Sequence, residues 1–253
     1  MDAKTVTCTA LPGIPLIEPG DDLCPIIAGA LAAADIVPCD GDTLVIAQKI
    51  VSKAEGRYVE LAEVAPSARA LELAAATGKD ARLIEVILSE STEIIRQHKD
   101  LLIVAHRLGY VMANAGVDQS NITGGDRVLL LPENPDASCA TLKAAFDRTF
   151  GADIAVVIND SFGRAWRNGV VGVALGAAGL PALRNLIGRP DLFGRPMRVT
   201  EVAIADELAA AASLMMGQAD EGTPVVHVRG LRWSERPANA AALIRPKHMD
   251  LFR

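Results

Sequence analysis

The chain has 253 residues, of which 50% are hydrophobic, 4% aromatic and 22% charged, and its formal net charge is −6. This length and composition are enough for a substantial aliphatic core, in one large domain or two small ones. Because there is no basic stripe and no interleaving of basic with aromatic residues, a nucleic-acid partner is not expected.

Cysteine usage and the amino terminus favour a cytoplasmic protein. Cys8, Cys24, Cys39 and Cys139 form no C-x-x-C pair and have no histidine at metal-ligand spacing, which is typical of reduced thiols. The first ten residues lack the apolar stretch of a signal peptide, and no run approaches the roughly 18 apolar residues that span a bilayer. We therefore expect no membrane partner.

Apolar periodicity and turn residues predict a mixed series of elements. In chain order these are a strand (6–17), a helix (23–34), a strand (43–50), two helices (67–76 and 80–96), two strands that form a hairpin (101–105 and 109–115), a strand (127–131), a helix (136–150), two strands (153–158 and 170–175), a helix (199–215) and a strand (224–229). Ser67 is a candidate N-cap with Gly78 as the stop of its helix, and Thr200 is a candidate cap of the last helix.

The order of these elements favours an α+β fold with mixed or mainly antiparallel sheets and flanking helices. Strands and helices do not alternate strictly, so a doubly wound parallel sheet is less favoured. We expect a single unit over 1–253, in which the helical pair 67–96 could form a separate lobe. P-loop, dinucleotide-binding, nucleophile-elbow and H-E-x-x-H motifs are all missing from the sequence.

The most informative segment is N-D-S-F-G-R-A-W-R, at 159–167, which follows the apolar strand 153–158. The oxygens of Asp160 and Ser161 can hold a divalent cation, and Arg164 and Arg167 can hold phosphate or carboxylate. Metal and anion binding at a sheet edge together indicate phosphoryl chemistry. The alternative is a polar turn whose arginines form surface ion pairs.

Four further polar clusters lie between apolar segments, at 11–14, 48–53, 118–121 and 216–223. Glycine lets backbone N–H groups approach a ligand closely in the first and last of them, and lysine can neutralise phosphate in the second. In the third, Asp118 can ligate a cation and Asn121 can contact a nucleotide. Each cluster has an ordinary alternative: a turn, a solvated strand end, an Asx-turn or a helix C-cap.

Taken together, the clusters resemble one family. The motifs L-P-G-I (11–14), I-V-S-K-A-E-G (50–56), N-A-G-V-D-Q-S-N (114–121), D-S-F-G-R-A-W-R (160–167) and A-D-E-L (205–208) are similar to those of coenzyme F420:L-glutamate ligases, the γ-glutamyl ligases of deazaflavin cofactor synthesis. The resemblance runs in order over about 9–231. It implies a cytoplasmic enzyme that forms an intertwined homodimer, here without the flavin-binding extension fused to some relatives.

The resemblance also implies a reaction. Members use GTP as co-substrate with divalent cations, Mg or Mn, to convert the carboxylate of the deazaflavin precursor to an acyl phosphate, which the amine of L-glutamate attacks. Two such cations are expected, and a monovalent cation is a further candidate cofactor. Asp118 and Asp160 resemble ligands of one divalent cation, and Ser161 and Gln218 resemble ligands of the second.

The expected nucleotide-binding positions share a place in the matched motifs. They are Leu11, Pro12, Gly13, Ile14, Gln48, Lys49, Lys53, Asn121, Met216, Gly217, Gln218, Ala219, Asp220, Glu221, Gly222 and Thr223. From charge and position alone, Lys53, Arg164 and Arg167 are candidate catalytic charges for the migrating phosphoryl group or the acidic substrates.

Other functions remain open at this point. The same glutamate ligation could act on another carboxylated cofactor, such as a pterin or a furan. Two metals and a carboxylate cluster also suit a metal-dependent phosphohydrolase. A catalytically silent nucleotide-binding protein is a third class, which the presence of both Asp118 and Asp160 disfavours.

Overall fold

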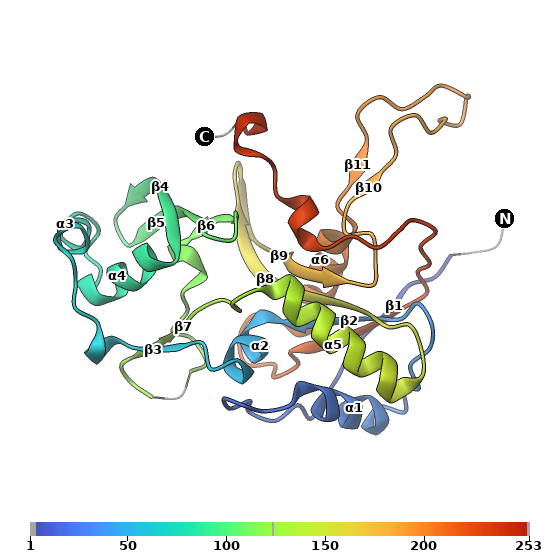
Figure 1. Cartoon of the computed structure of the whole chain (residues 1–253), viewed down its shortest axis with the longest axis horizontal. Helices are drawn as coiled ribbons and strands as arrows, with labels where there is room; N and C mark the ends of the chain where they lie inside the picture. Colours follow the sequence, from blue (N-terminus) through green and yellow to red (C-terminus); the bar gives the residue numbers. More distant parts are fainter. Residues whose placement is uncertain (1–3, 123, 252–253) are drawn as a thin grey trace.

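The computed structural model describes residues 4–122 and 124–251, which form a central five-stranded sheet with helices on both faces and a smaller lobe at one side (Figure 1). Within these ranges the predicted α+β class with mixed and antiparallel sheets is confirmed. All strand pairs there are antiparallel except β2 with β8.

The central sheet has the order β1-β12-β2-β8-β9. Its strands are β1 (Thr7–Ala10), β12 (Val225–Arg229), β2 (Thr43–Ala47), β8 (Ala155–Arg164) and β9 (Arg167–Ala178). β2 runs parallel to β8 and ends at Ala47, opposite Asn159. Because β8 continues beyond that point, its polar residues from Asn159 onward lie at the open edge where β2 ends.

Alternate residues of β8 pack into different cores. Val156 and Ile158 belong to the core under α1 (Leu23–Ala33) and α5 (Pro135–Phe150), whereas Ala155 and Val157 belong to the core under α6 (Ile204–Met216). All four are buried. A period of two is that of a strand, and covering both faces explains the uncharged run that predicted a buried strand here.

The lobe has a hydrophobic core of its own. α3 (Ala68–Thr77) and α4 (Ala81–Ser89) pack on the three-stranded sheet of β4 (Ser91–His98), β5 (Leu101–His106) and β6 (Val111–Ala113). As predicted, the Ser67 hydroxyl accepts a hydrogen bond from the N–H of Ala70 at 3.2 Å, and Gly78 ends α3 with a φ of 77°. β3 (Tyr58–Glu60) and β7 (Arg127–Leu129) form a short antiparallel pair between the lobe and α2 (Gln48–Ala54).

Four local predictions are wrong or only partly right. The helix expected at 80–96 ends at Ser89, because the β-branched residues that follow pair with β5. The strand expected at 43–50 ends at Ala47, and α2 begins directly after it. The strand expected at 6–17 covers only residues 7–10. The strand expected at 153–158 runs on to Arg164 as one arm of a hairpin with β9, so the segment 159–164 is not a turn.

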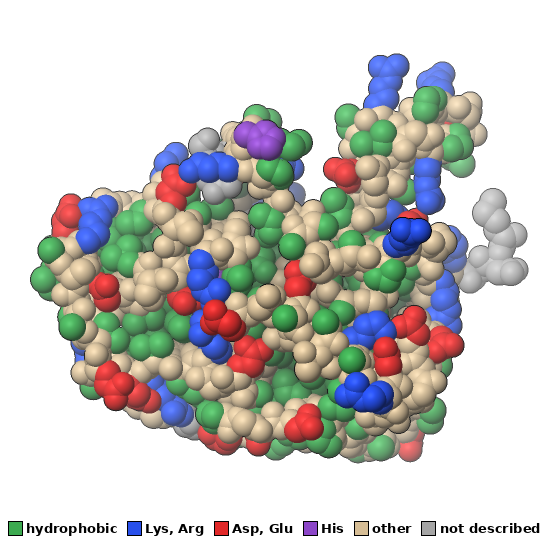
Figure 2. All heavy atoms as spheres, viewed as in Figure 1, with side chains coloured by type: hydrophobic (Ala, Val, Ile, Leu, Met, Phe, Trp, Pro, Cys, Tyr) green, Lys and Arg blue, Asp and Glu red, His purple; other side chains and the backbone are tan. Residues whose placement is uncertain are grey.

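Thr200 does not cap the last helix. It precedes the short strand β11 (Glu201–Val202), and α6 begins after Ala203, which offers no side-chain cap. β11 pairs with β10 (Arg184–Asn185) at the base of an arm, residues 186–200, that projects from the body (Figure 1). At its tip Leu192 and Phe193 are 99% and 85% exposed, and Figure 2 shows apolar and basic side chains gathered on the arm.

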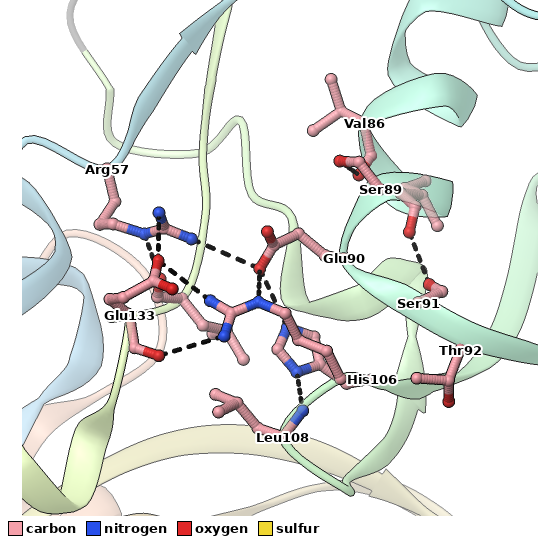
Figure 3. Close-up of polar contacts among 12 residues, drawn as sticks. Arg57, Val86, Ser89, Glu90, Ser91, Thr92, His106, Leu108 and Glu133 are labelled. Carbon is pink, nitrogen blue, oxygen red and sulfur yellow. Dashed lines mark hydrogen bonds and ion pairs between the residues drawn. The ribbon is translucent and has the colours of Figure 1, made fainter.

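A buried carboxylate attaches the lobe to the main body (Figure 3). One Glu90 oxygen lies 3.0 Å from Nε of Arg107, 3.4 Å from Arg57 and 3.4 Å from Nε2 of His106, and both arginines also contact Glu133. Burial by itself raises the pKa of Glu90, but His106 and the arginines outweigh it and hold that pKa below its usual value. We interpret this network as structural.

The chain after β12 crosses the surface and contains two single-turn 3-10 helices, η3 (Ala240–Leu243) and η4 (Lys247–Met249). Two further 3-10 turns, η1 (Leu61–Glu63) and η2 (Asn114–Gly116), lie in the first half of the chain. Within the described ranges, no helix has the length and apolar character needed to cross a membrane.

Candidate functional site

A cavity of about 480 Å³ opens where β2 ends beside β8. It gathers most of the predicted site residues from five separate parts of the chain. Those that line it are Ile14, Gln48, Lys49, Lys53, Asp118, Asn121, Asp160, Ser161, Met216, Gly217, Gln218, Ala219, Asp220, Glu221, Gly222 and Thr223. Polar clusters up to 200 residues apart in sequence are thus brought to one place.

Some predicted residues lie elsewhere. Leu11 is fully buried in the main core, its N–H donates to the carbonyl of Val225, and it does not line the cavity. Pro12 and Gly13 are exposed and outside the cavity lining. Arg167 is exposed beside the β8–β9 turn, and the side chain of Arg164 falls outside the described part of the structure.

Two of the carboxylates that line the cavity, Asp118 and Asp160, have different surroundings. Asp118 is positioned by a bridge to β7, where its N–H and C=O pair with Leu129. Burial raises the pKa of Asp118, but Lys49 and the Ser120 N–H outweigh it and hold that pKa below its usual value. Asp160 accepts a hydrogen bond only from the N–H of Ser161, at 2.8 Å, among its described contacts. Burial, with the charge of Asp118 added, raises the pKa of Asp160 to about 6.

Two lysines on one face of α2 line the cavity. Lys49 and Lys53 are four residues apart, a spacing that puts both on the same side of a helix. The ammonium group of Lys49 lies 2.8 Å from a carboxylate oxygen of Asp118 and also donates to the hydroxyl of Ser120 at 2.9 Å. Lys53 donates to the carbonyl of Asn121 at 2.8 Å, and burial together with Lys49 lowers the pKa of Lys53.

The loop after α6 closes the cavity and needs its glycine. Gly217 has a φ of 74°, and a Cβ there would come within 2.0 Å of the Glu221 carboxyl carbon. The Glu221 carboxylate accepts a hydrogen bond from the N–H of Ala219 at 2.8 Å, and Asn121 donates its amide to the Ala219 carbonyl at 3.2 Å. The loop is thereby held against the 118–121 segment, with backbone groups exposed to the cavity.

The donor set fits hard cations. In the described ranges no three His, Cys, Asp or Glu side chains gather at one point. The cavity offers instead the carboxylates of Asp118 and Asp160, the Ser161 hydroxyl and the Gln218 amide. Oxygen ligands of this kind suit Mg²⁺ or Mn²⁺. The raised pKa of Asp160 has the same implication, since a nearby cation would stabilise its ionised form.

Sequence reasoning gave no role to three polar residues in this lining, Ser120, Asn159 and Ser213. The signal for Asn159 was its place at the end of an apolar strand directly before Asp160. A second hollow, of about 840 Å³, lies beside the start of α5 and contains none of the predicted site residues. Its acidic lining residue, Asp136, accepts hydrogen bonds from the N–H groups of Ala177, Ala240 and Ala241, so we interpret Asp136 as structural.

Comparisons with known proteins identify the family of this chain. The family described as F420-0:Gamma-glutamyl ligase matches residues 13–230, a span that includes every segment of the cavity. The chain therefore belongs to the F420-0:gamma-glutamyl ligase family, as its motifs indicated.

Similar proteins cover nearly the whole chain. A coenzyme F420:L-glutamate ligase of Methanothermobacter thermautotrophicus is 45% identical over 250 residues, which is 98% of this chain and 99% of the relative. The Methanopyrus kandleri protein of the same name is 47% identical over 94% of this chain and 93% of its own length. The Methanocaldococcus jannaschii protein is 45% identical over 85% of each.

Proposed function

We propose that this chain is a GTP-dependent ligase that joins L-glutamate to the carboxylate of the coenzyme F420 precursor. Family membership and relatives named for this ligation support the reaction. The observation that carries the proposal is the meeting of Asp118, Asp160, two lysines and a glycine-bounded loop in one cavity. That combination suits a polyphosphate with its cations.

The proposed reaction has two steps. The acceptor carboxylate attacks the γ-phosphorus of GTP, which forms an acyl phosphate and releases GDP. The amine of glutamate then attacks the acyl carbon, the amide bond forms, phosphate leaves with the electrons of the acyl C–O bond, and the amine gives up a proton. Both steps depend on alignment and charge neutralisation more than on a protein nucleophile.

The residues of this cavity have distinct proposed tasks. Asp118 and Asp160 hold one divalent cation, and Ser161 and Gln218 hold a second; when bound, these cations neutralise the phosphate oxygens. The lysines and the loop from Met216 to Thr223 bind the nucleotide. Lys49 pairs with Asp118 at 2.8 Å and lines the same cavity, so its ammonium group would bind phosphate oxygens there.

We propose that Arg167 binds a carboxylate of a substrate. Arg167 is exposed at the turn of the β8–β9 hairpin, where a carboxylate in solution can reach it.

The arm carries the exposed side chains of Leu192 and Phe193, and apolar tips of this kind favour contact with another protein surface. We propose a homodimer, with the cytoplasm as its compartment. Light scattering of wild type and Phe193→Ser tests it, and a wild-type monomer contradicts it.

The first experiment combines the purified protein with GTP, Mn²⁺, L-glutamate and the deazaflavin precursor, and reads products by mass spectrometry. A mass gain of one or more glutamyl units with GDP release supports the ligase and counts its additions. ATP and Mg²⁺ replace GTP and Mn²⁺ in parallel reactions, and reactions with and without K⁺ test a monovalent cation.

Two other functions give different results in the same assay. GTP hydrolysis that is unchanged when glutamate and acceptor are omitted would contradict the ligase in favour of a phosphohydrolase, for which the two neighbouring carboxylates are the supporting observation. Metal-dependent GTP binding without product would redirect the search to a pterin or furan acceptor.

A further inference from the structure

The side-chain oxygen of Asn159 is buried and has no hydrogen-bond partner in the described part of the structure. Asn159 as a whole is 4% exposed. A buried polar atom left unsatisfied destabilises the fold, so such an atom in a folded protein needs an explanation. One common explanation is a ligand that supplies the missing contact.

The strand places this amide beside the second proposed cation site. Asn159 and Ser161 have the same parity on β8 as Ala155 and Val157, which pack under α6, whereas Phe162 packs into the opposite core. Asn159 therefore shares a face with Ser161 and not with Asp160. It also lines the same cavity as Gln218, which follows α6.

We propose that Asn159 is a third protein oxygen ligand of the cation held by Ser161 and Gln218, an inference that rests on the proposed function. An amide oxygen is a ligand type that Mg²⁺ and Mn²⁺ accept, and these ions take about six oxygens. The Asn159 oxygen has no described hydrogen bond to lose on binding a cation, and the residue lines the cavity in which that cation would lie.

This assignment makes the two cation sites chemically different. Asp118 and Asp160 supply charge, so the first site binds a cation in the absence of nucleotide. Asn159, Ser161 and Gln218 are all neutral, so the second site depends on phosphate oxygens for charge. The second cation therefore binds together with the nucleotide.

The test measures Mn²⁺ binding by electron paramagnetic resonance, with and without GDP, for wild type, Asn159→Ala and Asn159→Asp. We expect wild type to bind one ion alone and two with GDP. Asn159→Ala should weaken only the GDP-dependent ion, by about 10-fold or more. Asn159→Asp should retain that ion and make it less dependent on GDP, because the new carboxylate supplies charge.

Thr43→Val is the matched control. The Thr43 hydroxyl is also buried and unpartnered in the described structure, but it lies at the opposite end of β2, away from the cavity. Its removal should leave both Mn²⁺ ions unaffected. Because each substitution removes an unsatisfied atom, neither Asn159→Ala nor Thr43→Val should lower the melting temperature without cations.

Several outcomes overturn the proposal in distinguishable ways. Unchanged GDP-dependent Mn²⁺ binding in Asn159→Ala would contradict the ligand assignment while leaving the proposed function intact. A weaker GDP affinity that is equal with and without Mn²⁺ would assign Asn159 to the nucleotide. A lower melting temperature in Asn159→Ala alone would assign a structural role. Wild type that binds no Mn²⁺ would contradict the proposed function itself.

Discussion

Two acids beside the opposite ends of β2 have different surroundings. At the amino end, Asp42 is fully buried and lies 2.8 Å from Nε2 of His227 and 2.6 Å from a guanidinium nitrogen of Arg229. At the carboxyl end, Asp160 has the Ser161 N–H as its described hydrogen-bond donor, and the neighbouring Asn159 has none for its Oδ1. Asp42, directly before β2, is thus paired with two basic side chains. Asp160, on β8 beside the end of β2, has a backbone N–H as its described partner.

The pKa directions express the same contrast. Burial raises the pKa of Asp42, but Arg229 and His227 outweigh it and hold that pKa well below its usual value. Burial raises the pKa of Asp160 to about 6, because no described cation lies close enough to reverse the effect. A paired buried charge stabilises one structure, whereas a buried charge that lacks its partner marks a place for a ligand.

The largest expected effect is on turnover at the carboxyl end. Asp160→Asn should leave the fold intact and lower ligase turnover by about 1,000-fold or more, because it removes charge from a proposed cation ligand that is worth several kcal/mol. Product formation by mass spectrometry and melting by circular dichroism check both parts. Near-normal turnover in this variant would refute the cation assignment.

The matching substitution at the amino end should act on stability alone. Asp42→Asn leaves His227 and Arg229 without their shared carboxylate and should lower the free energy of unfolding by about 3 kcal/mol. Urea unfolding measures the loss, and kcat at a temperature where the variant is folded should equal that of wild type. An Asp42→Asn variant with wild-type stability but altered kcat would contradict a structural role for Asp42.

A smaller effect is expected for the nucleotide. Lys53→Ala removes a charge from the cavity wall and should weaken GTP binding by about 10-fold, measured by calorimetry. Lys143→Ala is the matched control, because Lys143 pairs with Asp147 and Asp153 away from the cavity. If both variants bind GTP as wild type does, the lysine has no nucleotide role.

The smallest expected effect is the pH dependence of the stability that Asp42 contributes. The pKa of Asp42 is lower in the folded than in the unfolded chain, so Asp42 stabilises the fold above about pH 4, and this contribution is lost as the pH falls further. The stability difference between wild type and Asp42→Asn should therefore shrink below about pH 4. A difference that stays constant down to about pH 3 would contradict the pairing.

Local signals predicted most of the fold. The Ser67 cap, the glycine that ends α3 and the β-branched run of β8 all act within a few residues of chain. The failures were places where a distant partner decided. The segment after Ser89 continues a helical pattern but pairs with β5, and β8 lengthens because β9 is there to pair with it.

The candidate site divides in the same way. The types of residue that hold phosphate and cations were visible in the sequence, and the family resemblance put them together before any geometry was known. The contact between Lys49 and Asp118, 69 residues apart, was not visible, nor was the orphaned oxygen of Asn159. Both depend on where β2 stops beside β8.

The sequence by itself determined the family, the two ends of α3, and the polar residue types after the strands, because these depend on residue type and short spacing. Only the tertiary structure decided which acid is paired and which is not. Burial and pairing depend on neighbours that the fold brings from elsewhere in the chain, so Asp42 before β2 is paired with His227 and Arg229, whereas Asp160 beside the end of β2 lines the cavity.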